Sequence, residues 1–141
     1  MSRVNIQQVQ PAAYQAMFGL EGYIAKSTIA ANLQEMVRIR ASILNGCQFC
    51  IGMHTEAATK LGESNERITA LASWKESTLF NEKEQAVLAA TDEITNISVD
   101  GLTKETYTNL GMFFSEEEIA QLIMLVALIN TWNRIGVSMA G

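Results

Sequence analysis

The only two cysteines and the only histidine of the chain lie close together, as Cys47, Cys50 and His54. On a helix, residues three or four positions apart share one face, so these three side chains would point the same way. Such an arrangement suits thiol redox chemistry, because a thiolate is the attacking species and a neighbouring histidine can manage its proton. The spacing therefore predicts a redox-active dithiol at the start of a helix.

The two cysteines are expected to play different parts. The partial positive charge of a helix N-terminus favours thiolate formation at Cys47, whereas His54 lies one turn from Cys50. His54 could also protonate the leaving oxygen of a peroxide. We therefore predict that Cys50 attacks the peroxide and that Cys47 then closes a disulfide on the sulfenic acid, within one chain.

Glu35 is the expected third member of a relay. It lies one predicted helix earlier, and Asn45-Gly46 forms the short link between the two helices. If these helices pack antiparallel, Glu35 approaches His54, orients the imidazole and holds its charge. The alternative for Glu35 is an ordinary solvated charge on a helix surface.

Other uses of the cysteine pair are open at this point. A C-x-x-C pair is also half of a zinc site, but a closed site here would need His54 with Glu35 or a second chain. Buried inert cysteines explain neither the pair nor the histidine. We expect no cofactor and no metal. The alternatives to a peroxidase are a general disulfide oxidoreductase, a redox or metal sensor, and a non-redox lyase.

Composition limits the class of protein. With 141 residues, of which 48% are hydrophobic, the chain predicts one globular domain over residues 1–141. The net charge of -5 argues against nucleic acid or an anionic membrane as a partner. The first residues lack a signal-peptide core, and the apolar run at 119–129 is shorter than the ~20 residues a bilayer requires. We expect a cytoplasmic protein, and structural disulfides are rare in the cytoplasm.

The positions of turn and capping residues in the sequence predict an all-α protein of about seven helices. Gly19 and Gly22 are expected to break or bend the first helix. The stretch 119–129 is apolar on nearly every side, so it is either a central core helix or is partly covered by another subunit. The expected helices span residues 12–20, 27–44, 47–61, 64–72, 81–95, 103–111 and 115–138.

The pattern Glu35, Cys47, Cys50 and His54 resembles the AhpD-like alkylhydroperoxidases of the carboxymuconolactone decarboxylase superfamily. In that family a Glu is followed twelve residues later by C-x-x-C, and a His stands four residues beyond the second Cys. The cysteine motif is the specific part of a resemblance that covers most of the chain. It continues through Ala57, Ala58 and Gly62, and at 74–77, 80–84, 91–95 and 130–134.

This resemblance implies an all-helical subunit that assembles into homotrimers or homohexamers. It implies peroxidase activity with Cys50 peroxidatic and Cys47 resolving, and a dithiol reductant such as a lipoyl-bearing protein. One position departs from the best-known members, because Phe49 stands where they carry a second histidine. Decarboxylases of lactones in the superfamily generally lack the cysteine pair, which argues against that chemistry here.

Several polar and aromatic residues have no role that the sequence defines. Trp74 and Trp132 are expected in the core or at an interface. Arg38 and Arg40 are expected to be solvated or paired with acids. Asn133 and Arg134 belong to the region of resemblance, but their residue types alone indicate no chemistry.

Overall fold

The computed structural model of the protein describes residues 2–141, and every regular element over that range is helical. Nine α-helices and one 3₁₀ helix occur in this part of the chain, which confirms the all-α prediction but exceeds the expected count of about seven. The helices are α1 (Ile6–Val9), α2 (Pro11–Ala25), α3 (Ala31–Asn45), α4 (Gln48–Lys60), α5 (Asn65–Ala70), η1 (Leu71–Glu76), α6 (Glu82–Thr95), α7 (Ile97–Asp100), α8 (Lys104–Gly111) and α9 (Glu116–Met139).

Side-chain caps fix the starts of most of the longer helices. Asn81 with Glu84 forms a capping box at the start of α6, within the predicted helix 81–95. Ser115 with Glu118 does the same for α9. Thr103 caps α8 through the backbone N–H of Thr106. These local hydrogen bonds explain why the predicted starts of α6, α8 and α9 agree with the structure. Helix α3 has no side-chain cap and begins at Ala31, four residues later than predicted.

The glycines of α2 do not break it, contrary to the sequence-based expectation. Helix α2 runs unbroken from Pro11 to Ala25, through both Gly19 and Gly22. A glycine inside a helix costs roughly 1 kcal/mol relative to alanine, but it does not stop the backbone hydrogen bonds. The short helices α1 and α7 were not predicted, because each contains only four residues and shows no periodicity.

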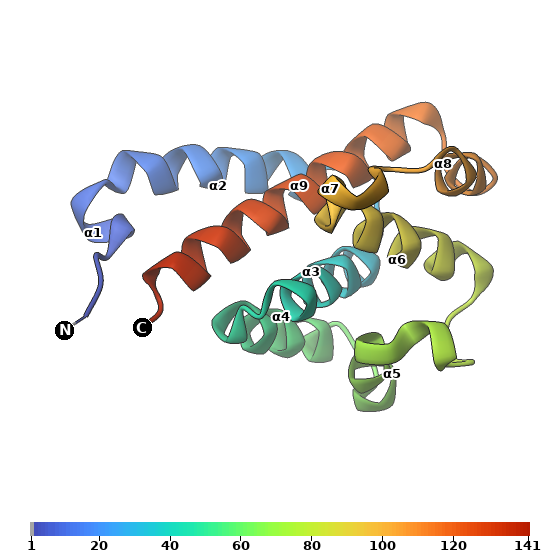
Figure 1. Cartoon of the computed structure of the whole chain (residues 1–141), viewed down its shortest axis with the longest axis horizontal. Helices are drawn as coiled ribbons and strands as arrows, with labels where there is room; N and C mark the ends of the chain where they lie inside the picture. Colours follow the sequence, from blue (N-terminus) through green and yellow to red (C-terminus); the bar gives the residue numbers. More distant parts are fainter. Residues whose placement is uncertain (1) are drawn as a thin grey trace.

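Helix α3 lies at the centre of the fold. It packs against α4, α6 and α9, and its buried side chains include Met36, Val37 and Ile39. Figure 1 shows α2 running alongside α9, with the two ends of the chain near each other. Hydrogen bonds tie these ends together, from Arg3 to the carbonyl of Ser138 and from the Ile6 N–H to Met139 Sδ. At the other end of α3 the chain turns back into α4, and the two cysteines lie at this turn.

Helix α9 is only partly buried within this chain. Leu125 and Ile129 lie in the core, whereas Met124 is 40% exposed on the opposite side. The helix spans 24 residues and is long and apolar enough to cross a membrane, so the expectation of too short a run is corrected. One such helix is weak evidence for a membrane protein, and α9 packs against α2, α3, α6 and α8 as core helices do.

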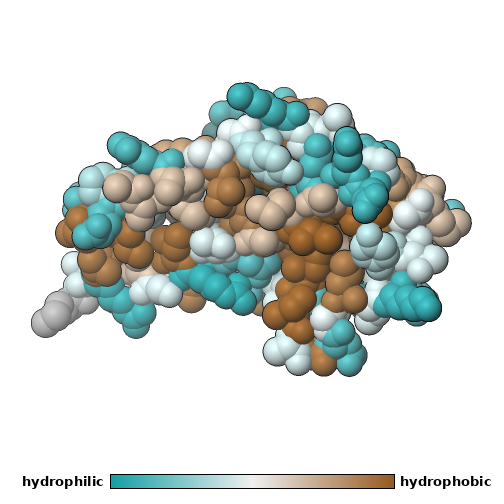
Figure 2. All heavy atoms as spheres, turned by 90° about the horizontal axis from the view of Figure 1, so that it is seen from above, coloured by the Kyte–Doolittle hydropathy of each residue, from teal (hydrophilic) through white to brown (hydrophobic). Residues whose placement is uncertain are grey.

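The outer side of α2 is apolar and uncovered. Ile24 is its only buried residue, while Phe18, Leu20 and Tyr23 are each at least 40% exposed. Leu20 and Tyr23 lie beside Met124 and form with it an apolar strip across α2 and α9, whereas Phe18 packs near Trp132 on another side of α2. Figure 2, which views the molecule from above, shows hydrophobic side chains gathered among polar ones on that face. A single chain leaves this strip in contact with solvent.

Candidate active site

The cysteine pair occupies the start of α4. Helix α3 ends at Asn45, and its C-cap Gly46 has a φ of 68°, in the left-handed region that glycine adopts without strain. Cys47 is the N-cap of α4, and its Sγ accepts a hydrogen bond from the backbone N–H of Cys50 at 3.4 Å. A disulfide joins the two cysteines, with their Cα atoms 5.3 Å apart. The structure therefore shows the predicted pairing within one chain, at the predicted helix start.

The Glu35 carboxylate meets His54 across the α3–α4 contact. His54 Nδ1 lies 2.8 Å from Glu35 Oε2, and each side chain is 12% exposed. Because an ionised carboxylate only accepts hydrogen bonds, the Nδ1–H donates and Nε2 is the nitrogen left for a ligand. The two helices thus meet as the short Asn45-Gly46 link predicted. The geometry is that of an oriented general acid–base.

A buried arginine links Glu35 to a second carboxylate that the sequence did not indicate. Arg38 contacts Glu35 Oε1 through Nη1 and Glu21 Oε2 through Nη2, each at 2.9 Å. Trp132 Nε1 donates to the other oxygen of Glu21 at 2.9 Å. Arg38 is only 7% exposed, so its charge needs both carboxylates as partners. The result is one connected chain, Glu21–Arg38–Glu35–His54.

The other residues without an assigned role have structural positions. Arg40 pairs with Asp92, and Trp74 donates to the same carboxylate at 3.1 Å. Trp74 is buried, as expected for a core residue, whereas Trp132 borders the cavity described below. Arg134 contacts the side-chain oxygen of Asn130 at 2.9 Å.

The environment of Glu35 keeps its carboxylate ionised. Burial alone would raise its pKa, but the hydrogen bond from His54 and the charge of Arg38 outweigh burial. The pKa of Glu35 is therefore lowered from its ordinary value of 4.5. An ionised Glu35 is the state that can hold the Nδ1–H of His54 and stabilise a protonated imidazole.

We expect Glu35 to make stability depend on pH. Because its folded-state pKa lies below the ordinary value, its contribution is fully present above that value and is lost as the pH falls through the folded-state pKa. Urea unfolding of the oxidised protein from about pH 7 to about pH 3 should therefore show a steeper loss of stability in the wild type than in Glu35→Gln. Parallel curves for the two proteins would contradict the lowered pKa.

A cavity of about 490 Å³ opens to the surface beside this cluster. Cys50 borders the cavity and Cys47 does not, although both are at most 4% exposed. The cavity therefore offers an approach to the predicted attacking sulfur. Its ionisable residues are Glu21, Glu35, Arg38 and His54, and its apolar walls include Tyr14, Phe18, Phe49, Met53, Trp132 and Met139.

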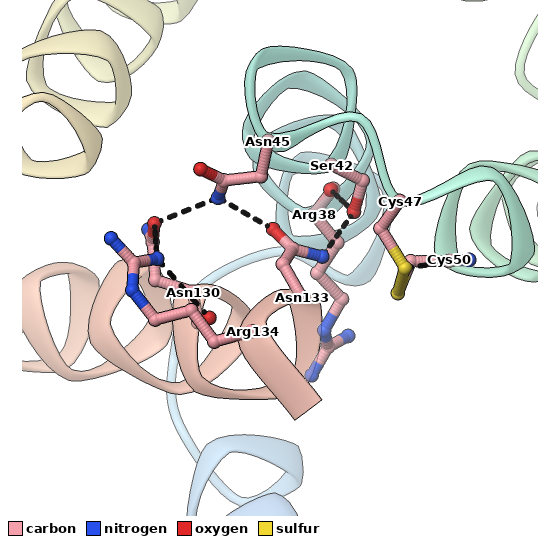
Figure 3. Close-up of a disulfide and its surroundings, with 8 residues drawn as sticks. All are labelled: Arg38, Ser42, Asn45, Cys47, Cys50, Asn130, Asn133 and Arg134. Atoms are coloured by element: carbon pink, nitrogen blue, oxygen red, sulfur yellow. Dashed lines mark hydrogen bonds between the residues drawn. A yellow bond between two sulfur atoms is a disulfide. The ribbon is translucent and has the colours of Figure 1, made fainter. Parts of the chain in front are cut away.

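A network of amide side chains fixes α9 behind the cysteines. Asn133 is fully buried, and its Nδ2 donates to Ser42 Oγ at 2.9 Å. Asn45 Nδ2 donates to both Asn133 and Asn130. Figure 3 shows these side chains bridging α3 and α9 next to the disulfide. The network uses the 130–134 segment noted in the sequence, whose purpose its residue types alone did not reveal.

A metal site would need a cluster of ligands, and the part of the chain that the structure describes contains none. Over residues 2–141, no group of three or more His, Cys, Asp or Glu side chains is placed to hold a metal ion. The cysteine sulfurs are bonded to each other, and His54 Nδ1 faces Glu35. The arrangement as a whole fits a dithiol redox site.

Comparison with known proteins identifies the family. The chain belongs to the carboxymuconolactone decarboxylase family, whose sequence model matches residues 11–93. That range contains Glu35, both cysteines and His54. The family match and the structural neighbours confirm the resemblance to AhpD-like proteins drawn from the sequence.

Three relatives illustrate the similarity. Uncharacterized protein YdfG of Bacillus subtilis is 35% identical, over 97% of this chain and 93% of its own. A crystal structure of an Agrobacterium tumefaciens protein of unknown function, proposed there to be the antioxidant defence protein AhpD, is 34% identical with a TM-score of 0.95 over 99% of this chain and 95% of that one. The debrominase Bmp8 is 25% identical with a TM-score of 0.79 over 94% of this chain and 72% of its own.

Proposed function

We propose that this protein is a cytoplasmic thiol-dependent peroxidase that reduces hydroperoxides by cycling Cys47 and Cys50 between dithiol and disulfide. The observation that carries the proposal is the position of Cys50, which borders the cavity while its disulfide partner Cys47 lies behind it. The pair of Glu35 and His54 on the same cavity supports it further. Family members include enzymes and an AhpD-like candidate for antioxidant defence, which agrees with this assignment.

The proposed reaction begins with the thiolate of Cys50. It attacks the terminal oxygen of the hydroperoxide, the O–O bond breaks, and the alcohol leaves with a proton supplied by His54. Cys50 is now a sulfenic acid. The Cys47 thiol attacks that sulfur, water leaves, and the disulfide forms. A dithiol reductant then transfers two electrons and two protons, which restores both thiols and leaves the reductant as a disulfide.

Proton handling in this proposal depends on one histidine. His54 is the only histidine in the sequence, and Phe49 occupies the position of the second histidine found in the best-known relatives. The Phe49 ring is 75% exposed at the cavity mouth, where it can contact an incoming molecule but cannot transfer a proton. His54, oriented by Glu35, therefore serves both the attacking thiol and the leaving oxygen.

A second candidate activity is reductive debromination of an aromatic compound. It is favoured by the similarity to the debrominase Bmp8 and by the aromatic walls of the cavity. The same dithiol would supply the electrons. The carbon–bromine bond would break, hydrogen would replace bromine, bromide would leave with a proton, and the disulfide would form.

A turnover assay separates these activities. Reduced protein is mixed with tert-butyl hydroperoxide or with 2,3,4-tribromopyrrole, and dihydrolipoamide is supplied in excess. The proposal expects many equivalents of hydroperoxide consumed per subunit and no release of bromide. Bromide release without peroxide consumption would favour the second activity. A single equivalent of peroxide consumed, with no further turnover despite excess reductant, would point to the sensor alternative.

We also propose that the protein is a homo-oligomer, a trimer or hexamer. The apolar strip of Leu20, Tyr23 and Met124 supports this, because a second copy would remove it from water. Light scattering at micromolar concentration should give a mass of three or six times 15.5 kDa. Tyr23→Glu with Met124→Glu should shift the protein toward monomers. A mass near one chain for the wild type would contradict the proposal.

A further inference from the structure

Helix α9 passes so close to the disulfide that a side chain on one of its residues would crowd a sulfur atom. A Cβ atom built on Gly136 would lie 3.0 Å from Cys47 Sγ and 3.6 Å from Cys50 Sγ. The first distance is shorter than an ordinary carbon–sulfur contact. Gly136 has no positive φ, so the backbone does not require glycine there. The space beside the sulfurs is what requires it.

The helix is held at this position on both sides of Gly136. One turn earlier, Asn133 is fixed to Ser42 by a buried hydrogen bond of 2.9 Å (Figure 3). One turn later, Met139 Sδ accepts a hydrogen bond from the N–H of Ile6. A side chain at position 136 could therefore not be accommodated by moving α9 away. The sulfur of Cys47 would have to move instead.

We propose that Gly136 is a positioning residue for the dithiol, because its missing side chain reserves the place that Cys47 Sγ occupies in the disulfide. This proposal rests on the Cys47–Cys50 redox cycle. In the oxidised protein the S–S bond fixes both sulfurs, so an added methyl group must be tolerated at close contact. In the reduced protein the Cys47 thiol can rotate away. A methyl group at position 136 therefore disfavours the disulfide more than the dithiol.

The test measures the thiol–disulfide equilibrium of Gly136→Ala against glutathione. Two glutathione thiols reduce the Cys47–Cys50 bond to two thiols, and one glutathione disulfide forms. We expect the equilibrium of the variant to move toward the dithiol by about tenfold, as overpacking of a buried site commonly costs. That change corresponds to about 30 mV in reduction potential. The readout uses no peroxide, so it remains informative if the proposed peroxidase activity fails.

The matched control is Gly52→Ala in the middle of α4. Gly52 is exposed, and a Cβ there would meet nothing within 4 Å, so its equilibrium should match the wild type. Both substitutions gain about the same helix propensity. An unchanged equilibrium in Gly136→Ala, or equal shifts in both variants, would overturn the proposal.

A variant without the Cys47 sulfur tests whether that atom is the one that a side chain at position 136 displaces. With Cys47→Ala the crowded atom is gone, so adding Gly136→Ala should leave the melting temperature unchanged or raise it. In the oxidised wild-type background the same substitution should lower it. If Gly136→Ala alone does not fold, folding of the double variant supports the proposal. A double variant that is as unstable as the single one shows that Cys47 Sγ is not the group displaced, and the proposal fails.

Discussion

Cys50→Ser is expected to consume no hydroperoxide, whereas Cys47→Ser should consume about one equivalent and then stop. Cys50 borders the cavity next to His54, so its loss would remove the proposed attacking sulfur. Cys47 lies outside the cavity, and its loss removes only the thiol that closes the disulfide. The Cys47→Ser protein should therefore accumulate a sulfenic acid at Cys50. Peroxide consumption and mass spectrometry after trapping with a 1,3-diketone measure both outcomes.

Alkylation of the reduced wild type provides an independent check on these two roles. If His54 activates Cys50, iodoacetamide at pH 6 to 7 should modify Cys50 before Cys47. The opposite order, together with loss of the initial peroxide reaction in Cys47→Ser, would contradict the assignment. The helix N-terminus would then outweigh the histidine, and the protein would act as a disulfide oxidoreductase whose nucleophile is Cys47.

His54→Gln should reduce peroxide turnover by roughly 10²-fold, because a general acid–base of this kind contributes about that much. Glutamine retains a hydrogen bond to Glu35 but cannot transfer a proton at neutral pH. The apparent pKa of the reactive thiol should rise as well. Glu35→Gln should act in the same direction but more weakly, since Glu35 contacts His54 and not the peroxide.

Stopped-flow measurement of the first peroxide reaction, repeated over a range of pH, separates chemistry from folding. Glu56→Gln on the same helix is the control. Its carboxylate is exposed and contacts only the exposed Lys60, at 3.3 Å, so the rate should not change. A His54→Gln protein with the wild-type rate and an unchanged pH profile would remove His54 from the mechanism and leave Cys50 to act without a proton donor.

The parts of the site that the sequence predicted all depend on local geometry. The C-x-x-C spacing placed both cysteines and His54 on one helix, and the short Asn45-Gly46 link brought Glu35 to His54. The starts of α6, α8 and α9 agreed because their caps are formed by residues three positions apart, whereas the uncapped α3 begins four residues later than predicted. Such contacts form between residues that are close in the sequence, so periodicity and capping rules were sufficient to predict them.

The missed parts depend on how distant helices pack. Glu21 and Trp132 meet through a hydrogen bond between residues that are 111 positions apart, so no local pattern reveals it. The role of Gly136 also escapes sequence reasoning, because a single glycine near the end of a helix predicts flexibility or a cap. Only its position over the two sulfurs shows that its lack of a side chain matters.

The chain of charged side chains also limits which molecules the cavity admits. Glu21 and Glu35 bring two negative charges to its wall, and Arg38 brings one positive charge. While both carboxylates are ionised, the sum is negative or zero, whether or not His54 carries a proton. An anion entering the cavity would lose hydration without gaining an attractive field. We therefore expect the wall to favour an uncharged hydroperoxide or dithiol over carboxylates, phosphates and deprotonated peroxides.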